Sequence, residues 1–180
     1  MIQPSVIQPS VIPQNRTVHA VLDTPVGPLT LVGDGHALSG LYFPDHARQP
    51  KADSFGPRDD RGFADARAQL AEYFGGERTE FDLTLTPQGN EFQRSVWRLL
   101  GAIPYGQTRT YGQLAKLLGD PGLARAVGAA NGRNPISIVV PCHRVVGRDG
   151  SLTGYAGGLA RKAFLLELER PAAARVATLF

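Results

Sequence analysis

The hydrophobic pattern of this chain changes near residue 87, and that change restricts the possible folds more than any other feature of the sequence. Before it, short β-branched runs alternate with turn residues and with one amphipathic helix; after it, apolar residues recur mainly at helical spacing. Strands followed by helices predict an α+β protein. We therefore expect a small sheet-and-helix domain at 16–86 and a mostly helical domain at 90–170, with tails at 1–15 and 171–180.

Four strands and one helix are expected in the first domain. Gly33-Asp34-Gly35 is a hairpin signal, so the first three strands should form an antiparallel meander. The helix carries its apolar residues on one side. The predicted strands are Thr17–Leu22, Leu29–Val32, Ala37–Phe43 and Thr79–Leu85, and the predicted helix is Asp59–Phe74, with Phe63, Ala66, Leu70, Tyr73 and Phe74 inward.

Two short helices joined by a tight turn are predicted in the second domain, after an opening helix at Asn90–Leu100. Thr110-x-x-Gln113 has the form of a capping box, and Gly119 suits the position that follows a helix. Asp120-Pro121 then combines an N-cap acceptor with a proline at the first helical position. This spacing predicts a helix-turn-helix whose second helix runs from Pro121 to Asn131.

The second of these helices carries mostly small side chains. Ala126, Gly128 and Ala129 add little bulk, and Arg125 is its one long side chain. Such a surface can approach a nucleic-acid groove closely, although it can equally pack against a neighbouring helix. Residues 1–91 carry 7 Lys and Arg against 12 Asp and Glu, whereas residues 92–180 carry 12 against 4. This excess of positive charge in the second half favours DNA as its partner.

Cys142 is the only cysteine, and it directly precedes His143. A lone cysteine forms no intramolecular disulfide, and a neighbouring imidazole can activate a thiol as a nucleophile. Most free cysteines, however, are buried and inert, so the adjacency by itself leaves both interpretations open. We expect Cys142 to follow the end of a buried strand formed by Ile136–Val140.

A final helix is predicted at Leu159–Arg170, with Phe164, Leu165 and Leu168 inward. Glu169, near its end, could hold His143 in one tautomer and complete a cysteine-histidine-acid relay. A glutamate on such a helix is more commonly part of a solvated face, and the sequence leaves that alternative open.

Other kinds of site have little support in the sequence. His19, His36 and His46 lack the spacing of a metal-ligand cluster, so we expect no metal. No apolar stretch approaches the roughly 20 residues that cross a bilayer. Residues 1–14 lack the basic start and the unbroken apolar run of a secretory signal. Together with the single cysteine, these features predict a cytoplasmic protein that does not bind membranes.

Several motifs, in this order, resemble one known family. Ala124-Arg125-Ala126-Val127-Gly128 and Asn134-Pro135 precede Pro141-Cys142-His143-Arg144-Val145, and Tyr155-Ala156-Gly157-Gly158-Leu159 follows it. From about Phe92 to Glu169 the chain is similar to the O6-alkylguanine-DNA alkyltransferases, also called methylated-DNA–protein-cysteine methyltransferases. The resemblance implies a ribonuclease-H-like N-terminal domain and an alkyltransferase domain that contains the helix-turn-helix.

The resemblance also implies a reaction and the residues that carry it. Cys142 would take an alkyl group from O6 of a guanine flipped out of duplex DNA, irreversibly and once per molecule. Glu169, His143 and a bridging water would deprotonate the thiol. Tyr111 would rotate the 3′ phosphate and donate to guanine N3, and Asn134 would orient the cysteine end of its loop.

The same resemblance assigns residues to the DNA and to the base. Arg125 would fill the space that the flipped base leaves. The backbone carbonyls of Cys142 and Val145 would accept from the exocyclic amine, and the amide of Ala156 would face O6. The implied DNA-binding residues are Arg125, Tyr111, Ala126, Gly128 and Ala129, and the implied pocket residues are Val145, Tyr155, Ala156 and Gly157.

The implied partner is double-stranded DNA carrying O6-alkylguanine, bound by a monomer through the minor groove, with cooperation along DNA left open and no cofactor required. Some relatives hold structural zinc partly through N-terminal cysteines, which this chain lacks. Two alternatives come from other classes of protein. A lesion-binding sensor would not need Cys142, and a regulator using only the helix-turn-helix would leave Pro141-Cys142-His143-Arg144 unexplained.

Overall fold

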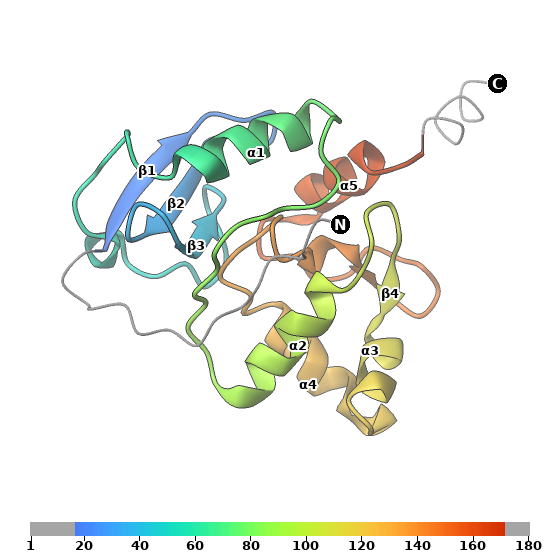
Figure 1. Cartoon of the computed structure of the whole chain (residues 1–180). Helices are drawn as coiled ribbons and strands as arrows, with labels where there is room; N and C mark the ends of the chain where they lie inside the picture. Colours follow the sequence, from blue (N-terminus) through green and yellow to red (C-terminus); the bar gives the residue numbers. More distant parts are fainter. Residues whose placement is uncertain (1–16, 172–180) are drawn as a thin grey trace.

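The structure is a computed structural model that describes residues 17–171 (Figure 1). The expected tails lie outside this range, apart from Pro171. The elements are, in chain order, β1 (Val18–Leu22), β2 (Leu29–Gly33), β3 (Leu38–Tyr42), the 3-10 helix η2 (Ala52–Phe55), α1 (Ala64–Phe74), α2 (Glu91–Gly101), β4 (Arg109–Thr110), α3 (Tyr111–Leu117), η3 (Pro121–Leu123), α4 (Ala124–Asn131), η4 (Cys142–Arg144), β5 (Val145–Val146) and α5 (Leu159–Leu168).

The first three strands form an antiparallel meander in the order β1-β2-β3, as the sequence predicts. Ala20 pairs with Leu31, and Leu31 pairs with Leu41; all three side chains are fully buried. Since alternate residues of a strand point to the same face, this register places the apolar face of the sheet toward the core. In Figure 1, α1 lies beside this sheet, and α2, α3 and α4 gather on the other side of the molecule.

Helix α1 begins at Ala64, five residues later than the predicted start at Asp59. The Asp59 N–H donates to the His19 carbonyl, and the Asp59 carbonyl accepts from Gly62, so this segment forms a turn attached to β1. Phe63 then has a left-handed backbone, with φ of 60°, which prevents an earlier helical start. Of the residues predicted to face inward, all are buried except Phe74, which is half-buried.

Two predicted strands are absent from the described chain, Thr79–Leu85 and Ile136–Val140, and both contribute single bridges to β3 instead. Leu38 pairs with Leu85, and Leu41 pairs with Ile136. The same edge of β3 is therefore shared between two segments, and neither has room for a continuous ladder. Apolar runs of this length cannot be assigned to a strand or a buried turn from their pattern alone.

The helix-turn-helix forms as predicted, with one difference at its second helix. Both expected capping geometries are present: the Thr110 hydroxyl accepts from the Gln113 N–H, and the Asp120 carboxylate accepts from the Gly122 N–H. Gly119 follows the α3 C-cap with φ of 94°, as a C′ glycine does. The second helix starts as the 3-10 turn η3 and becomes α-helical only at Ala124.

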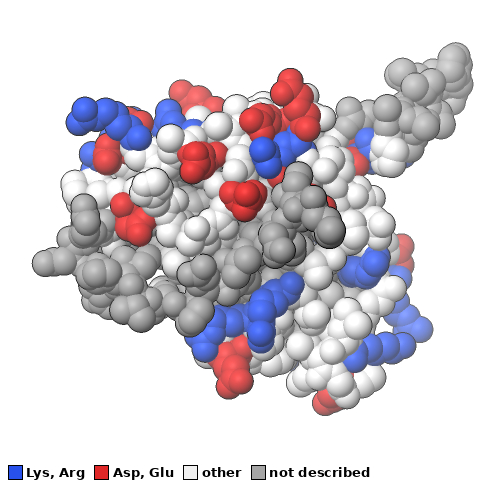
Figure 2. Space-filling view, viewed as in Figure 1, with Lys and Arg blue, Asp and Glu red and all other residues white. Residues whose placement is uncertain are grey.

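One apolar core joins the sheet-and-helix part to the helical part. It contains Leu31 and Leu70 from the first and Val96, Val127 and Leu165 from the second. Surface charge is distributed unevenly over this framework: Figure 2 shows carboxylates mainly around α1 and Lys and Arg side chains mainly around the helical part. No helix of the described residues is long and apolar enough to cross a membrane.

Candidate active site

Cys142 lies at the start of the 3-10 turn η4, which follows a buried turn rather than the predicted strand. The turn contains Ile138, a β-branched residue with φ of 70°, which is a strained conformation. The Asn134 side chain holds this turn closed: its Nδ2 donates to the Ile136 and Val140 carbonyls, and its Oδ1 accepts from the Ile136 N–H. Asn134 thus sets the backbone path that leads to the cysteine.

The carboxylate of Glu169 is buried, with 1% of its surface exposed, and it is the centre of a dense network of hydrogen bonds. The alternative of a solvated glutamate is therefore wrong. His143 Nε2 lies 2.8 Å from its Oε1, and Arg144 binds both oxygens. The remaining donors are the Tyr73 hydroxyl, 2.7 Å from Oε1, and the Gly106 N–H, 3.3 Å from Oε2.

This network sets the charges of Glu169 and His143. Burial raises the pKa of Glu169, but hydrogen bonds from His143 and Arg144 outweigh it and lower the pKa to about 2. Burial lowers the pKa of His143 below its ordinary value, against the pull of Glu169. At neutral pH the pair is a carboxylate and a neutral imidazole.

The charges also decide which imidazole nitrogen is basic. A carboxylate only accepts hydrogen bonds, so His143 Nε2 carries the proton and Nδ1 has a free lone pair. Nδ1 is buried and has no hydrogen-bond partner among the residues that the structure describes. It can therefore receive a proton.

The Cys142 thiol differs from the activated thiol that the sequence predicts. Its side chain is 3% exposed, and burial raises its pKa, although a hydrogen bond from Asn134 and the charge of Lys162 act in the opposite direction. The resting thiol is therefore protonated at neutral pH. Its ionisation has to accompany the reaction rather than precede it.

Three residues have contacts in this region that the sequence did not predict: Tyr73, Arg144 and Lys162. Lys162 is fully buried, and its Nζ donates to the carbonyls of Val145 and Thr153, at 2.6 and 2.7 Å. Burial lowers its pKa to about 8. The burial of Lys162 could have been predicted from the sequence, because it lies three residues before Leu165 and so on the inward side of α5. Arg144 belongs to the motif Pro141-Cys142-His143-Arg144-Val145.

The predicted pocket residues lie around the glycine-rich loop at 154–158. Tyr155 is edge-on to Phe43 at 5.8 Å, and Gly157 is pressed against the same ring, where a Cβ would come within 2.4 Å of it. The Ala156 carbonyl accepts from Ala47, while its N–H donates to no acceptor within the described chain. Val145 is buried, and its carbonyl already accepts from Lys162, which leaves it one lone pair.

Three of the predicted DNA-binding residues lie on the exposed side of α4. Arg125, Ala126 and Ala129 are exposed, whereas Val127 and Ala130 are buried. The small residues Ala126 and Ala129 therefore do not serve the packing against neighbouring helices. Arg125 forms no hydrogen bond or ion pair with any residue in the described range.

Tyr111 connects this surface to the loop near Cys142. Its ring lies against Gly128, where an added Cβ would be 3.7 Å from it. Its hydroxyl is 3.5 Å from the carbonyl of Thr153, which also accepts from Lys162. The structure thus forms two groups from the predicted residues: Cys142, His143, Glu169 and Asn134 inside, and Tyr111, Arg125 and the small residues of α4 outside.

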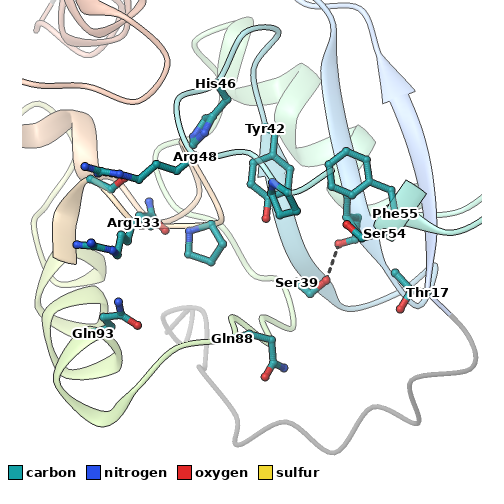
Figure 3. Close-up of a pocket in the computed structure, with 15 residues that line it drawn as sticks. Thr17, Ser39, Tyr42, His46, Arg48, Ser54, Phe55, Gln88, Gln93 and Arg133 are labelled. Atoms are coloured by element: carbon teal, nitrogen blue, oxygen red, sulfur yellow. Dashed lines mark hydrogen bonds between the residues drawn. The ribbon is translucent and has the colours of Figure 1, made fainter. Parts of the chain in front are cut away.

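The cavity drawn in Figure 3 lies apart from the cysteine. It has a volume of about 530 Å³ and separates Ser39 and Tyr42 of the sheet from Arg48 and Arg133. A second cavity, of about 540 Å³, is lined by Pro141 and Arg144. Neither lining contains Cys142, His143 or Glu169, so neither cavity is a pocket for a base at the thiol.

The histidines of the first domain have other contacts. His19 Nδ1 lies 2.9 Å from the Gly56 carbonyl, and His46 Nε2 lies 3.3 Å from Ser137 Oγ. Across residues 17–171, no group of three or more His, Cys, Asp and Glu side chains could hold a metal ion.

Comparison with known proteins gives consistent matches over both parts of the chain. Residues 17–87 match the family model described as "6-O-methylguanine DNA methyltransferase, ribonuclease-like domain". Residues 91–171 match the model described as "6-O-methylguanine DNA methyltransferase, DNA binding domain". The methylated-DNA–protein-cysteine methyltransferase of Mycolicibacterium paratuberculosis is 52% identical over 162 residues, which cover 90% of this chain and 98% of that protein.

Solved structures agree with these matches. The Mycobacterium tuberculosis O6-methylguanine methyltransferase superposes with a TM-score of 0.80 at 48% identity, covering 89% of this chain and 99% of that one. The M. tuberculosis OGT in complex with DNA gives a TM-score of 0.81 at 52% identity, and the match covers 84% of this chain and 92% of that one.

Proposed function

The chain belongs to the 6-O-methylguanine DNA methyltransferase family, and from this premise we propose that it repairs O6-alkylguanine in duplex DNA by moving the alkyl group to its own Cys142. It is a methylated-DNA–protein-cysteine methyltransferase. One observation carries the assignment of the nucleophile. The only cysteine directly precedes a histidine whose ring nitrogen lies 2.8 Å from a buried carboxylate.

The transfer begins with the protonated thiol of Cys142. His143 Nδ1 takes the thiol proton through the bridging water that the family resemblance implies, and Glu169 stabilises the imidazolium that forms. The sulfur then forms a bond to the alkyl carbon as the bond from that carbon to guanine O6 breaks. Guanine leaves with the electron pair and takes up one proton at N1 from water, the His143 imidazolium returns the thiol proton to water, and the protein keeps a thioether.

Groups around the base assist its departure. Negative charge develops on guanine as the alkyl group leaves, and donors aimed at that charge lower the barrier. The Ala156 N–H is assigned to O6 and the Tyr111 hydroxyl to N3. Val145 and Cys142 each retain a carbonyl lone pair for the exocyclic amine, since Lys162 and the Val145 N–H occupy the other lone pairs.

The exposed face of α4 is assigned to the minor groove of the duplex. Small side chains let the helix approach the groove, and Arg125 enters the stack in place of the flipped base. Flipping costs a few kcal/mol, less for a base that pairs badly, as an O6-alkylated guanine does. We expect a monomer to bind one lesion.

A mass measurement tests this function directly. The protein is incubated with a duplex oligonucleotide containing O6-methylguanine and digested, and the peptide that holds Cys142 should gain about 14 Da, one CH₂, at one equivalent of DNA. Cys142→Ala should bind the same duplex and gain no mass. Tight binding of the lesion without mass gain in the unaltered protein would identify a sensor instead, and equal binding to damaged and undamaged DNA would identify a regulator.

A further inference from the structure

Helix α1 of the ribonuclease-like part supplies a side chain to the Glu169 network. Tyr73 is fully buried, and its hydroxyl donates to Glu169 Oε1 at 2.7 Å, from a position 96 residues earlier in the chain. His143 and Glu169 themselves both lie in the second part. This hydrogen bond therefore crosses from the first part of the molecule to the proposed catalytic pair.

Tyr73 and His143 share a single carboxylate oxygen. Oε1 accepts from His143 Nε2 at 2.8 Å, from the Tyr73 hydroxyl at 2.7 Å and from Arg144 Nη2 at 3.0 Å. Each additional donor withdraws negative charge from that oxygen, so less remains to stabilise a proton on the imidazole. The tyrosine hydrogen bond thus lowers the basicity of His143.

The Tyr73 hydroxyl is fixed in this donor role. Its ring makes tilted or edge-on contacts with Phe74, Phe81 and Tyr105, with centroids 5.3, 5.4 and 6.2 Å away. Burial, followed by the charge of Glu169, raises the pKa of Tyr73 well above its ordinary value. The hydroxyl therefore keeps its proton at neutral pH and acts as a donor to Glu169.

We propose that Tyr73 is a positioning residue for alkyl transfer: by donating to Glu169 Oε1 it fixes the carboxylate and limits the proton affinity of His143. The ribonuclease-like part then acts on the chemistry as well as on the fold. This inference rests on the proposed roles of His143 and Glu169.

The test is the pH dependence of transfer from free O6-benzylguanine, which removes DNA binding from the measurement. Tyr73→Phe keeps the ring and removes the donor. Glu169 then holds the imidazolium more strongly, so the acid limb of the rate profile, where His143 becomes protonated, should move up by about half a pH unit. At pH values below the midpoint of this limb, the rate of Tyr73→Phe should be about threefold lower than that of the unaltered protein. At pH values above the midpoint, the two rates should differ less.

Tyr105→Phe is the matched control. This tyrosine is a neighbour of Tyr73, and its hydroxyl donates to the Leu168 carbonyl at 3.0 Å. It likewise removes one tyrosine hydrogen bond, with a smaller loss of stability because Tyr105 is half-buried, and it should leave the midpoint of the acid limb in place. Equal midpoints in the two variants would overturn the inference.

Two further measurements separate the possible failures. NMR titration of labelled His143 in Tyr73→Phe reports the imidazole pKa without any turnover, and an unchanged value would also overturn the inference. Glu169→Gln should abolish most of the transfer. If it transfers at the rate of the unaltered protein, the proposed catalytic pair is wrong; if it is inactive while Tyr73→Phe titrates normally, only the role of Tyr73 is wrong.

Discussion

At the scale of single residues, burial has opposite consequences for the thiol and for the imidazole beside it. Burial keeps the Cys142 thiol protonated and keeps His143 neutral. The thiol therefore holds a proton that the imidazole is able to accept. A protonated, buried thiol also reacts slowly with oxidants, because the thiolate is the reactive form. For a protein that uses its cysteine once, this arrangement preserves the nucleophile until a base reaches it.

Arg125→Ala is the prediction that belongs to this scale. The guanidinium is exposed, so its loss should hardly change the free energy of unfolding. Repair of O6-methylguanine in duplex DNA should slow by tenfold or more, on the order of the few kcal/mol of flipping that the arginine offsets. Transfer from free O6-benzylguanine should stay within about twofold, because that substrate needs no flipping. Equal losses with both substrates would exclude insertion into the stack.

At the scale of elements, the short turn before Cys142 decides where the sulfur lies. Asn134 makes three hydrogen bonds to the backbone of this turn, and they hold Ile138 in a left-handed conformation that costs about 1–2 kcal/mol. In the glycine-rich loop, Gly157 lies directly against the buried Phe43 ring. At this point the loop is closely packed against the core.

Gly157→Ala tests this close packing. The new methyl group would approach the Phe43 ring to 2.4 Å, and this ring is 1% exposed and has no room to move away. We expect a loss of about 1–3 kcal/mol in the free energy of unfolding, measured by urea denaturation, as for other overpacked sites. Gly101→Ala, in α2, is the control: its added methyl meets no atom within 4 Å, so stability should hold or rise by up to about 1 kcal/mol. A stable Gly157→Ala protein would show that the loop is free to shift.

At the scale of the whole molecule, Glu169 joins three distant segments. Tyr73 comes from α1, Gly106 from the loop after α2, and His143 and Arg144 from η4. Because these donors all converge on one charge, removing that charge should loosen the whole molecule rather than one loop. Folding stability should therefore depend on the ionisation of this single carboxyl group.

The pH dependence of stability tests this coupling. The pKa of Glu169 falls from 4.5 to about 2 on folding, so between these values the unfolded chain binds more protons than the folded one. The stabilisation is complete above about pH 4.5 and is lost as the pH falls toward 2, by up to roughly 3 kcal/mol. Urea unfolding at pH 6, 4.5 and 3 should show the stability difference between the unaltered protein and Glu169→Gln shrinking as the pH falls. A constant difference would mean that Glu169 is not the coupled group.

Much of this architecture follows from local rules that can be applied to the sequence alone. Capping side chains at Thr110 and Asp120 determine where helices begin, since each satisfies a backbone N–H only a few residues away. The meander around Gly33 likewise follows from turn chemistry and alternation. The adjacency of Cys142 and His143 left a nucleophile and an inert buried cysteine both open, and it was the ordered set of motifs between Ala124 and Leu159, through their resemblance to a known family, that predicted the chemistry.

Only the tertiary structure decided which groups surround that chemistry. Whether Ile136–Val140 became a strand or a turn depended on the edge of β3, which Leu85 already shares. Whether Glu169 faced solvent or a ring of donors depended on Tyr73 and Arg144, which reach it over separations of 96 and 25 residues. Such contacts form when the two parts close on one core, and no local pattern encodes them, because side-chain burial is a property of the folded chain as a whole.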